Sequence, residues 1–244
     1  MPEDVVRYLQ DALNDLFVTA PYTITYTAFQ FTLQWVAIAL SALYGMYTAR
    51  NRGMDFFGSM VIAFVSCTGG GTLRDLLLGR IPVFWLYTPA YAITIMIVSM
   101  LGYVVQRRLI VNRVRLLSRW LARPVEHIAT EDTPLLTAID ALALGLWAYL
   151  GTSFALQAGI NHIVAPIMGV MTASFGSVLR DVLFARVPEE FMPGHIYAMA
   201  ATVGAIVYSG AAWFGLDEEL SSLLCIGTAF GLRVASLRFN LKTG

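Results

Sequence analysis

The sequence predicts an all-α protein that crosses a membrane several times. Of its 244 residues, 57% are hydrophobic and 13% are charged, whereas soluble domains have about 45–50% apolar and about 25% charged residues. Four stretches carry no Asp, Glu, Lys or Arg, and each exceeds the roughly 20 residues that a helix needs to cross about 30 Å of hydrocarbon. They are residues 28–49, 81–106, 141–165 and 191–216. A soluble chain would not stay dissolved with four such stretches, so we place this protein in a membrane.

Seven membrane spans are expected. They cover about residues 28–49, 56–79, 87–106, 135–156, 162–185, 194–214 and 220–238. Residues 1–27 precede the first span, and their apolar side chains recur at helical spacing with acidic residues mostly elsewhere. That pattern predicts a short amphipathic helix on the membrane surface, and the segment is too acidic for a signal peptide.

Basic residues flank the spans unequally. Six arginines lie between residues 107 and 123, and further basic residues follow the first and seventh spans. All of them share one side if the N-terminus is outside, and the acidic loop 217–219 then lies on the other side. Positive residues favour the cytoplasmic side, so we expect a cytoplasmic C-terminus in the inner cell membrane. The basic loop, residues 108–133, is expected to contact anionic membrane lipids rather than nucleic acid.

A repeated motif divides the chain into two related units. GGGTLRDLLLGRIP at 69–82 aligns without gaps on FGSVLRDVLFARVP at 175–188, an offset of 106 residues with seven of fourteen positions identical. We therefore expect three-helix units at 28–107 and 134–216, with residues 217–244 forming a seventh helix and tail. Because three is odd, the second unit must cross the membrane upside down, and such inverted repeats place binding sites near the midplane.

Glycines stand at the centre of both repeated motifs. Glycine costs about 1 kcal/mol against alanine inside a helix, so the run Thr68–Thr72 is expected to break its helix, and the matching run Ser174–Ser177 to kink. Broken backbone at this depth must be packed in protein or line an aqueous path. The alternative interpretation is close helix packing, which small residues also serve in membranes.

Charged residues follow each glycine motif. Intramembrane charges usually face the protein interior and pair, so we expect Arg74 to pair with Asp181 and Arg180 with Asp75. These pairs would either lock the two units together or contact a permeating species. Asp140, early in the fourth span, would either attract cations into a vestibule or form a hydrogen bond at a helix end.

Enzymatic chemistry finds no support in the sequence. The three histidines and two cysteines show neither metal-ligand spacing nor a disulfide framework. No phosphate-binding glycine motif, Ser-His or Cys-His arrangement, or carboxylate dyad stands out. We expect a protein that is not an enzyme and has no metal or cofactor.

The segment GMDFFGSMVIAFVSCTGGGTLRDLLLGRIPVFW resembles the unit found twice in bacterial members of the trimeric intracellular cation (TRIC) channel family, a domain also labelled a glycine transporter. The resemblance implies a seven-helix protomer, a homotrimer, and one pore per protomer between kinked second and fifth helices. Potassium or sodium would be the permeant ion. Ser177 replaces a glycine of the usual second unit, and Phe175 could narrow the pore.

Two functions remain open at this point. A cation channel would place its constriction at Thr68, Gly69, Gly70, Gly71, Thr72, Ser174, Phe175, Gly176 and Ser177, with backbone carbonyls and hydroxyls replacing part of the water shell of the ion. A secondary transporter of a small zwitterion such as glycine would hold the carboxylate at Arg74 or Arg180 and the amine at Asp75 or Asp181. Inverted repeats alone do not choose between them; the resemblance favours the channel.

Overall fold

The computed structural model describes residues 27–117, 134–192 and 196–239, and within these ranges every regular element is a helix, with no strand. The elements are α2 (Ala28–Asn51), α3 (Phe56–Leu77), α4 (Phe84–Tyr87), α5 (Pro89–Leu117), α6 (Pro134–Gln157), α7 (Ala165–Leu183), η1 (Glu189–Phe191), α8 (Ala198–Trp213) and α9 (Glu218–Arg238). The expected amphipathic helix and most of the basic loop lie outside the described residues.

Helix length and composition confirm an all-helical membrane protein. Five of the described helices, α2, α3, α5, α6 and α9, are long and apolar enough to cross a bilayer. Their ends lie within about two residues of the predicted ends, except that α5 continues to Leu117. α7 and α8 are not among these five. α8 has only 16 residues, and α7 has 19 residues that include the Arg180–Asp181 pair.

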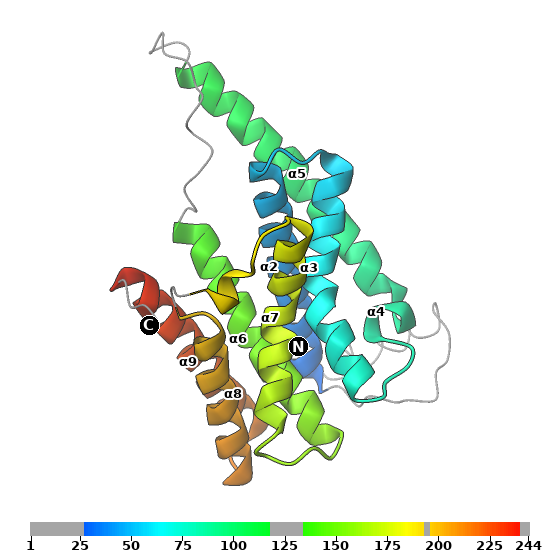
Figure 1. The fold of residues 1–244 in the computed structure, drawn as a ribbon, viewed down its shortest axis with the longest axis vertical. Coiled ribbons are helices and arrows are strands. Elements are labelled where there is room, and N and C mark those ends of the chain that lie inside the picture. Colours follow the sequence, from blue (N-terminus) through cyan, green and yellow to red (C-terminus); the bar gives the residue numbers. More distant parts are fainter. Residues whose placement is uncertain (1–26, 118–133, 193–195, 240–244) are drawn as a thin grey trace.

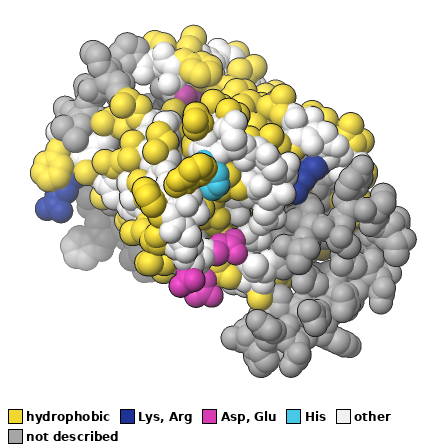
Figure 2. Space-filling model, turned by 90° about the horizontal axis from the view of Figure 1, so that it is seen from below, with side chains coloured by type: hydrophobic (Ala, Val, Ile, Leu, Met, Phe, Trp, Pro, Cys, Tyr) yellow, Lys and Arg dark blue, Asp and Glu magenta, His cyan; other side chains and the backbone are white. Residues whose placement is uncertain are grey.

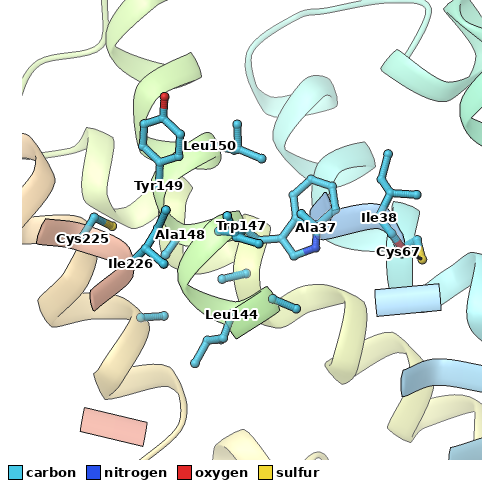
Figure 3. Packing of buried hydrophobic residues seen from close by; sticks show 14 of the residues in the cluster. Ala37, Ile38, Cys67, Leu144, Trp147, Ala148, Tyr149, Leu150, Cys225 and Ile226 are labelled. Atoms are coloured by element: carbon cyan, nitrogen blue, oxygen red, sulfur yellow. Dashed lines mark hydrogen bonds between the residues drawn. The ribbon is translucent and has the colours of Figure 1, made fainter. Parts of the chain in front are cut away.

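The helices surround α6, which is the most deeply buried of the five long apolar helices. Inside the protein, 83% of its apolar window is buried, against 28–44% for the other four. α6 contacts α2, α7, α8 and α9 (Figure 1). Its Trp147 extends toward Ala37, Ile38 and Cys67 of the neighbouring helices (Figure 3). The other long helices expose apolar side chains, and these cover much of the surface in Figure 2.

α3 and α7 pack against each other through their glycines. A Cβ atom at Gly70 would lie 2.1 Å from the carbonyl oxygen of Thr172, and one at Gly176 would lie 2.2 Å from the carbonyl oxygen of Ser66. The contacts are reciprocal, because the 106-residue offset converts Ser66 and Gly70 into Thr172 and Gly176. Reciprocal contacts of this kind are what a two-fold relation between the units predicts.

The prediction of a broken helix is wrong. α3 is continuous from Phe56 to Leu77, through the three glycines, and α7 is continuous through Gly176. The helices stay intact because Gly70 and Gly176 each face the backbone of the other helix, where the missing side chain permits close approach. Bending without a break stays a prediction.

Candidate functional site

A cavity lies between α2, α3, α6 and α7, on the Arg180 side of the crossing of α3 and α7. It offers about 30 Å³ to the centre of a water-sized sphere, more than the roughly 10–15 Å³ that one water needs. Its wall consists of Ser41, Tyr44, Ser66, Asp140, Ala143, Leu144, Trp147, Ala173, Ser177, Arg180 and Tyr197. Apolar side chains form much of the wall, but hydroxyls and the charged groups of Asp140 and Arg180 also line it, so the cavity can hold water or an ion.

Asp140 of α6 supplies the carboxylate of the cavity wall. The side chain is 8% exposed, and its Oδ1 accepts a hydrogen bond from the Tyr197 hydroxyl at 3.3 Å. The Tyr197 ring in turn lies 4.7 Å from the guanidinium of Arg233. Asp140 therefore makes the expected kind of hydrogen bond and also lines the cavity, while its attraction of cations stays a prediction.

Arg180 of α7 supplies the positive charge. Its Nε donates to Asp181 Oδ1 at 3.1 Å, and its guanidinium lies 5.4 Å from the Tyr44 ring centroid. Asp181 also accepts from Arg186 Nη2 at 2.9 Å. Two arginines thus compensate the one buried carboxylate of Asp181, and the charge of Arg180 faces both Asp181 and the cavity.

The expected pairing across the two units is wrong, because each arginine binds the aspartate that follows it in sequence. Arg74 Nε and Nη2 donate to Asp75 Oδ1 at 2.9 and 2.7 Å. The antiparallel contacts of the crossing place Arg74 and Arg180 on opposite sides of it. At about 1.5 Å of rise per residue, they are separated by about 18 Å along α3, beyond the reach of an ion pair.

The Arg74 end of the protein is closed. Arg74 is 1% exposed, and its guanidinium lies 5.8 Å from the ring of Phe84 and 4.6 Å from the ring of Phe154. Asp75 Oδ2 accepts from the Phe84 backbone N–H at 2.9 Å. The same Arg-Asp motif therefore borders a polar cavity at one end and is enclosed by aromatic rings at the other.

Of the nine sequence-predicted ion-path residues, Ser177 lines the cavity, together with Asp140 and Arg180. The hydroxyls of Thr68 and Ser174 donate to carbonyls of their own helices at 2.8 and 2.7 Å, and Thr72 accepts from Trp85. Gly69, Gly70 and Gly176 lie in the helix crossing, Gly71 contacts Phe84, and Phe175 is partly buried. Their place in an ion path stays a prediction.

Much of the cavity wall comes from residues that no sequence motif indicated. Ser41, Tyr44, Ser66, Trp147 and Tyr197 line it from α2, α3, α6 and the start of α8. The 106-residue offset held a usable signal, because it pairs Ser41 with Trp147, and Trp147 Nε1 donates to Ser41 Oγ at 2.9 Å. Two equivalent residues in contact mark the place where the units meet.

Glu190 of η1 lies next to the cavity wall. Its Oε1 accepts a hydrogen bond from Ser177, and its buried Oε2 has no hydrogen-bond partner among the described residues. Burial raises the pKa of Glu190 above its ordinary value of 4.5, the Ser177 hydrogen bond and the charge of Arg180 oppose the rise, and Asp181 adds to it. In the described part of the chain, no group of three or more His, Cys, Asp or Glu could hold a metal ion.

These features define the class: a helical membrane protein of two related halves with a polar cavity between them. A family model described as "Glycine transporter" matches residues 31–107 and again 137–213. The two matches are separated by the same 106 residues as the repeated motif.

Solved structures share the fold. A TRIC cation channel orthologue from Rhodobacter sphaeroides has 31% sequence identity and a TM-score of 0.71, over 88% of this chain and 100% of that one. A second TRIC cation channel has 27% identity and the same TM-score, over 88% of this chain and 95% of that one.

Proteins with similar sequences are also membrane proteins. The UPF0126 inner membrane protein YadS of Escherichia coli K12 is 32% identical over 211 residues, 86% of this chain and 92% of YadS. A UPF0126 membrane protein of Vibrio cholerae is 30% identical over 216 residues, 88% of this chain and 82% of that protein. The chain belongs to the bacterial TRIC family, whose sequence model bears the glycine-transporter description.

Proposed function

We propose that this protein is a channel for monovalent cations, with potassium as the physiological candidate and a path through each protomer between α3 and α7. The observation that carries the proposal is the polar cavity with Asp140 in its wall. The fold shared with TRIC cation channels supports it.

The chemistry of the cavity suits a weakly bound monovalent ion. Among the described residues that line the wall, Asp140 is the one carboxylate, and the surrounding donors of electron pairs are hydroxyls. Ca²⁺ takes six to eight oxygen ligands, usually from several carboxylates, and this wall does not offer such a set. Conduction needs a site that binds an ion and also releases it, and the positive charge of Arg180 in the same wall opposes tight cation binding.

The membrane arrangement belongs to the same proposal. We infer seven spans, α2, α3, α5, α6, α7, α8 and α9, built as inverted units at 28–107 and 134–216, with 108–133 between them and 217–244 as the seventh helix and tail. The reciprocal glycine contacts and the twice-matching family model support this division. We further infer a homotrimer in the inner membrane, surrounded by lipid, with the C-terminus and the Arg180 end toward the cytoplasm.

Ion flux in liposomes tests the function. Purified protein should pass potassium, seen as single-channel currents and as influx of thallium, a potassium surrogate. Asp140→Asn should lower this flux at least several-fold, because the neutral amide no longer attracts a cation. Glu219→Gln, at an exposed carboxylate of α9, should leave it unchanged. Equal flux through the wild type and Asp140→Asn would show that the cavity is not the ion path.

The second candidate is a transporter of a small zwitterion. Asp140 and Arg180 face the same cavity, and such a pair can hold an amine and a carboxylate together. The glycine-transporter description of the family model points the same way. Saturable uptake of labelled glycine without unitary currents would select the transporter; currents without uptake would select the channel.

A further inference from the structure

The cavity at the Arg180 end has a closed counterpart at the Arg74 end. Every residue of the cavity wall has an equivalent 106 positions away. Six of these equivalents are Gln34 for Asp140, Ile38 for Leu144, Cys67 for Ala173, Gly71 for Ser177, Arg74 for Arg180 and Tyr91 for Tyr197. All six are buried, and five are at most 3% exposed. Five of their counterparts at the Arg180 end, Asp140, Leu144, Ala173, Ser177 and Arg180, are also buried, at 1–8% exposed. The contrast therefore lies in the cavity that these residues border and not in their exposure.

One difference between the two ends lies at a pair of equivalent positions, Phe84 and Glu190. At the packed end, the ring of Phe84 lies against Gly71, where a Cβ atom would be 2.7 Å from Phe84 Cε1. At the open end, Glu190 accepts a hydrogen bond from Ser177, the equivalent of Gly71. An aromatic ring therefore fills at one end the space that hydroxyl and carboxylate groups border at the other.

Gln34 indicates that the packed arrangement has an alternative. The side chain is fully buried, and neither its amide nitrogen nor its amide oxygen has a hydrogen-bond partner within the described ranges. A buried amide without partners is costly and requires an explanation. Water entering a cavity at this end would satisfy both groups, just as the open cavity exposes the equivalent carboxylate of Asp140.

We propose that the Arg74 end holds a latent counterpart of the cavity, closed by Phe84, which admits water and a monovalent cation to Gln34 when the ring withdraws. The inference rests on the proposed function in that a conducting path must continue through this end. It also assigns a role to the Arg-Asp motif. Asp75 accepts a hydrogen bond from the backbone N–H of Phe84, and the Arg74 guanidinium lies beside the Phe84 ring. The Arg74–Asp75 pair therefore positions the ring that closes this end.

Cys67 provides a chemical test, because it is the equivalent of cavity-lining Ala173 and lies in the same buried cluster as Phe84. In a Cys225→Ala background it is the only cysteine. A charged methanethiosulfonate, added to both faces of the membrane, forms a mixed disulfide with a water-exposed thiolate and releases methanesulfinate. Phe84→Ala should raise the labelling rate of Cys67 at least tenfold, whereas Leu86→Ala, at an exposed position of α4, should not.

A second reporter separates opening from unfolding. Ala173→Cys in a Cys67→Ala, Cys225→Ala background should label readily in otherwise unchanged protein, and Phe84→Ala should not alter that rate. Faster labelling at both positions would mean general unfolding and would overturn the proposal. So would a Cys67 rate that Phe84→Ala leaves unchanged. Gln34→Met should slow Cys67 labelling and raise the melting temperature, because it removes the orphan amide; a lowered melting temperature would contradict this.

Thallium flux on the same variants separates this inference from the proposed function. Flux through the wild type with no effect of Phe84→Ala on Cys67 labelling would overturn the latent cavity and leave the channel intact. Faster Cys67 labelling without cation flux in any variant would overturn the channel and leave the latent cavity. Both proposals are supported if Phe84→Ala increases labelling and flux together.

Discussion

Gly70 and Gly176 set the distance between α3 and α7. Each faces a backbone carbonyl, of Thr172 and of Ser66, and a backbone atom cannot rotate away from an added methyl group. Overpacking of this kind costs about 1–3 kcal/mol or more. Gly70→Ala and Gly176→Ala should therefore each lower the melting temperature in detergent by several degrees, which a thermal unfolding assay will show.

Two other glycines serve as controls for that prediction. A methyl group at Gly69 would meet the flexible Cδ1 of Leu179 at 2.8 Å, and one at Gly227 in α9 would meet no atom of the described chain within 4 Å. Gly69→Ala should cost less than Gly70→Ala, and Gly227→Ala should be neutral or stabilising by up to about 1 kcal/mol. Equal melting temperatures for all four variants would refute the tight crossing.

Glu190 gives the stability of the protein a predictable pH dependence. Burial raises its pKa in the folded state, so the fold favours the neutral carboxyl, and stability falls as the pH rises from the ordinary value of 4.5 through the raised one. Glu190→Gln carries no such charge. Its melting temperature should exceed that of the wild type progressively as the pH rises through this window and should match it most closely at the acid end. A difference that grows toward acid pH would have the wrong sign.

At the residue scale, the sequence predicted which charged side chains are buried but not which of them form ion pairs. The repeat identified Arg74, Asp75, Arg180 and Asp181 as buried charges, and the structure agrees. Their pairing depended on where the two helices cross, and that point is fixed by contacts between residues far apart in the sequence. Local pattern carries no information about such contacts, so the pairing prediction failed.

At the scale of elements, the Arg74–Asp75 pair connects α3 to α4. Removing one member of a buried ion pair costs about 3–5 kcal/mol, whereas replacing both is often nearly neutral. Arg74→Met and Asp75→Asn should each be strongly destabilising. The double variant should recover much of the loss, because the amide oxygen that Asp75→Asn introduces would still accept the Phe84 backbone N–H. A double-mutant cycle of melting temperatures measures this coupling.

The double-mutant cycle of Arg74 and Asp75 can also contradict this prediction. If the double variant loses as much stability as the sum of the single variants, Arg74 and Asp75 act independently, and the positioning of α4 by their pair is wrong. A cross-unit pair of Arg74 with Asp181 would show coupling in the matching cycle. The structure places Asp181 with Arg180 and Arg186 instead, so that second cycle should show none.

Element boundaries could be predicted because they follow from local chemistry. Thr27 and Gln30 form a capping box at the start of α2, and the Asp55 carboxylate caps α3, where the apolar stretches begin. The glycine run was harder to interpret. Helix propensity predicts a break, but the backbone of α7 packs directly against Gly70, and this close contact stabilises the intact helix. Packing overrode propensity, as it does generally.

At the scale of the whole molecule, the cavity and its closed counterpart make the protein asymmetric across the membrane, so its orientation decides which solution the open cavity faces. Basic residues predict that the loop after α2 is cytoplasmic and that the loop before α9 is outside. In a Cys67→Ala, Cys225→Ala background, single cysteines at exposed Arg52 and exposed Asp217 report the two sides.

A membrane-impermeant maleimide should label Asp217→Cys in intact spheroplasts and Arg52→Cys only after permeabilisation. The Arg180 end, which lies on the same side as Arg52 because α2 ends and α7 ends there (Figure 1), would then open its cavity toward the cytoplasm. Phe84 would close the external end, and cytoplasmic potassium would reach Asp140 in the closed state. The reverse labelling pattern would place the open cavity outside and require external cations to occupy it first.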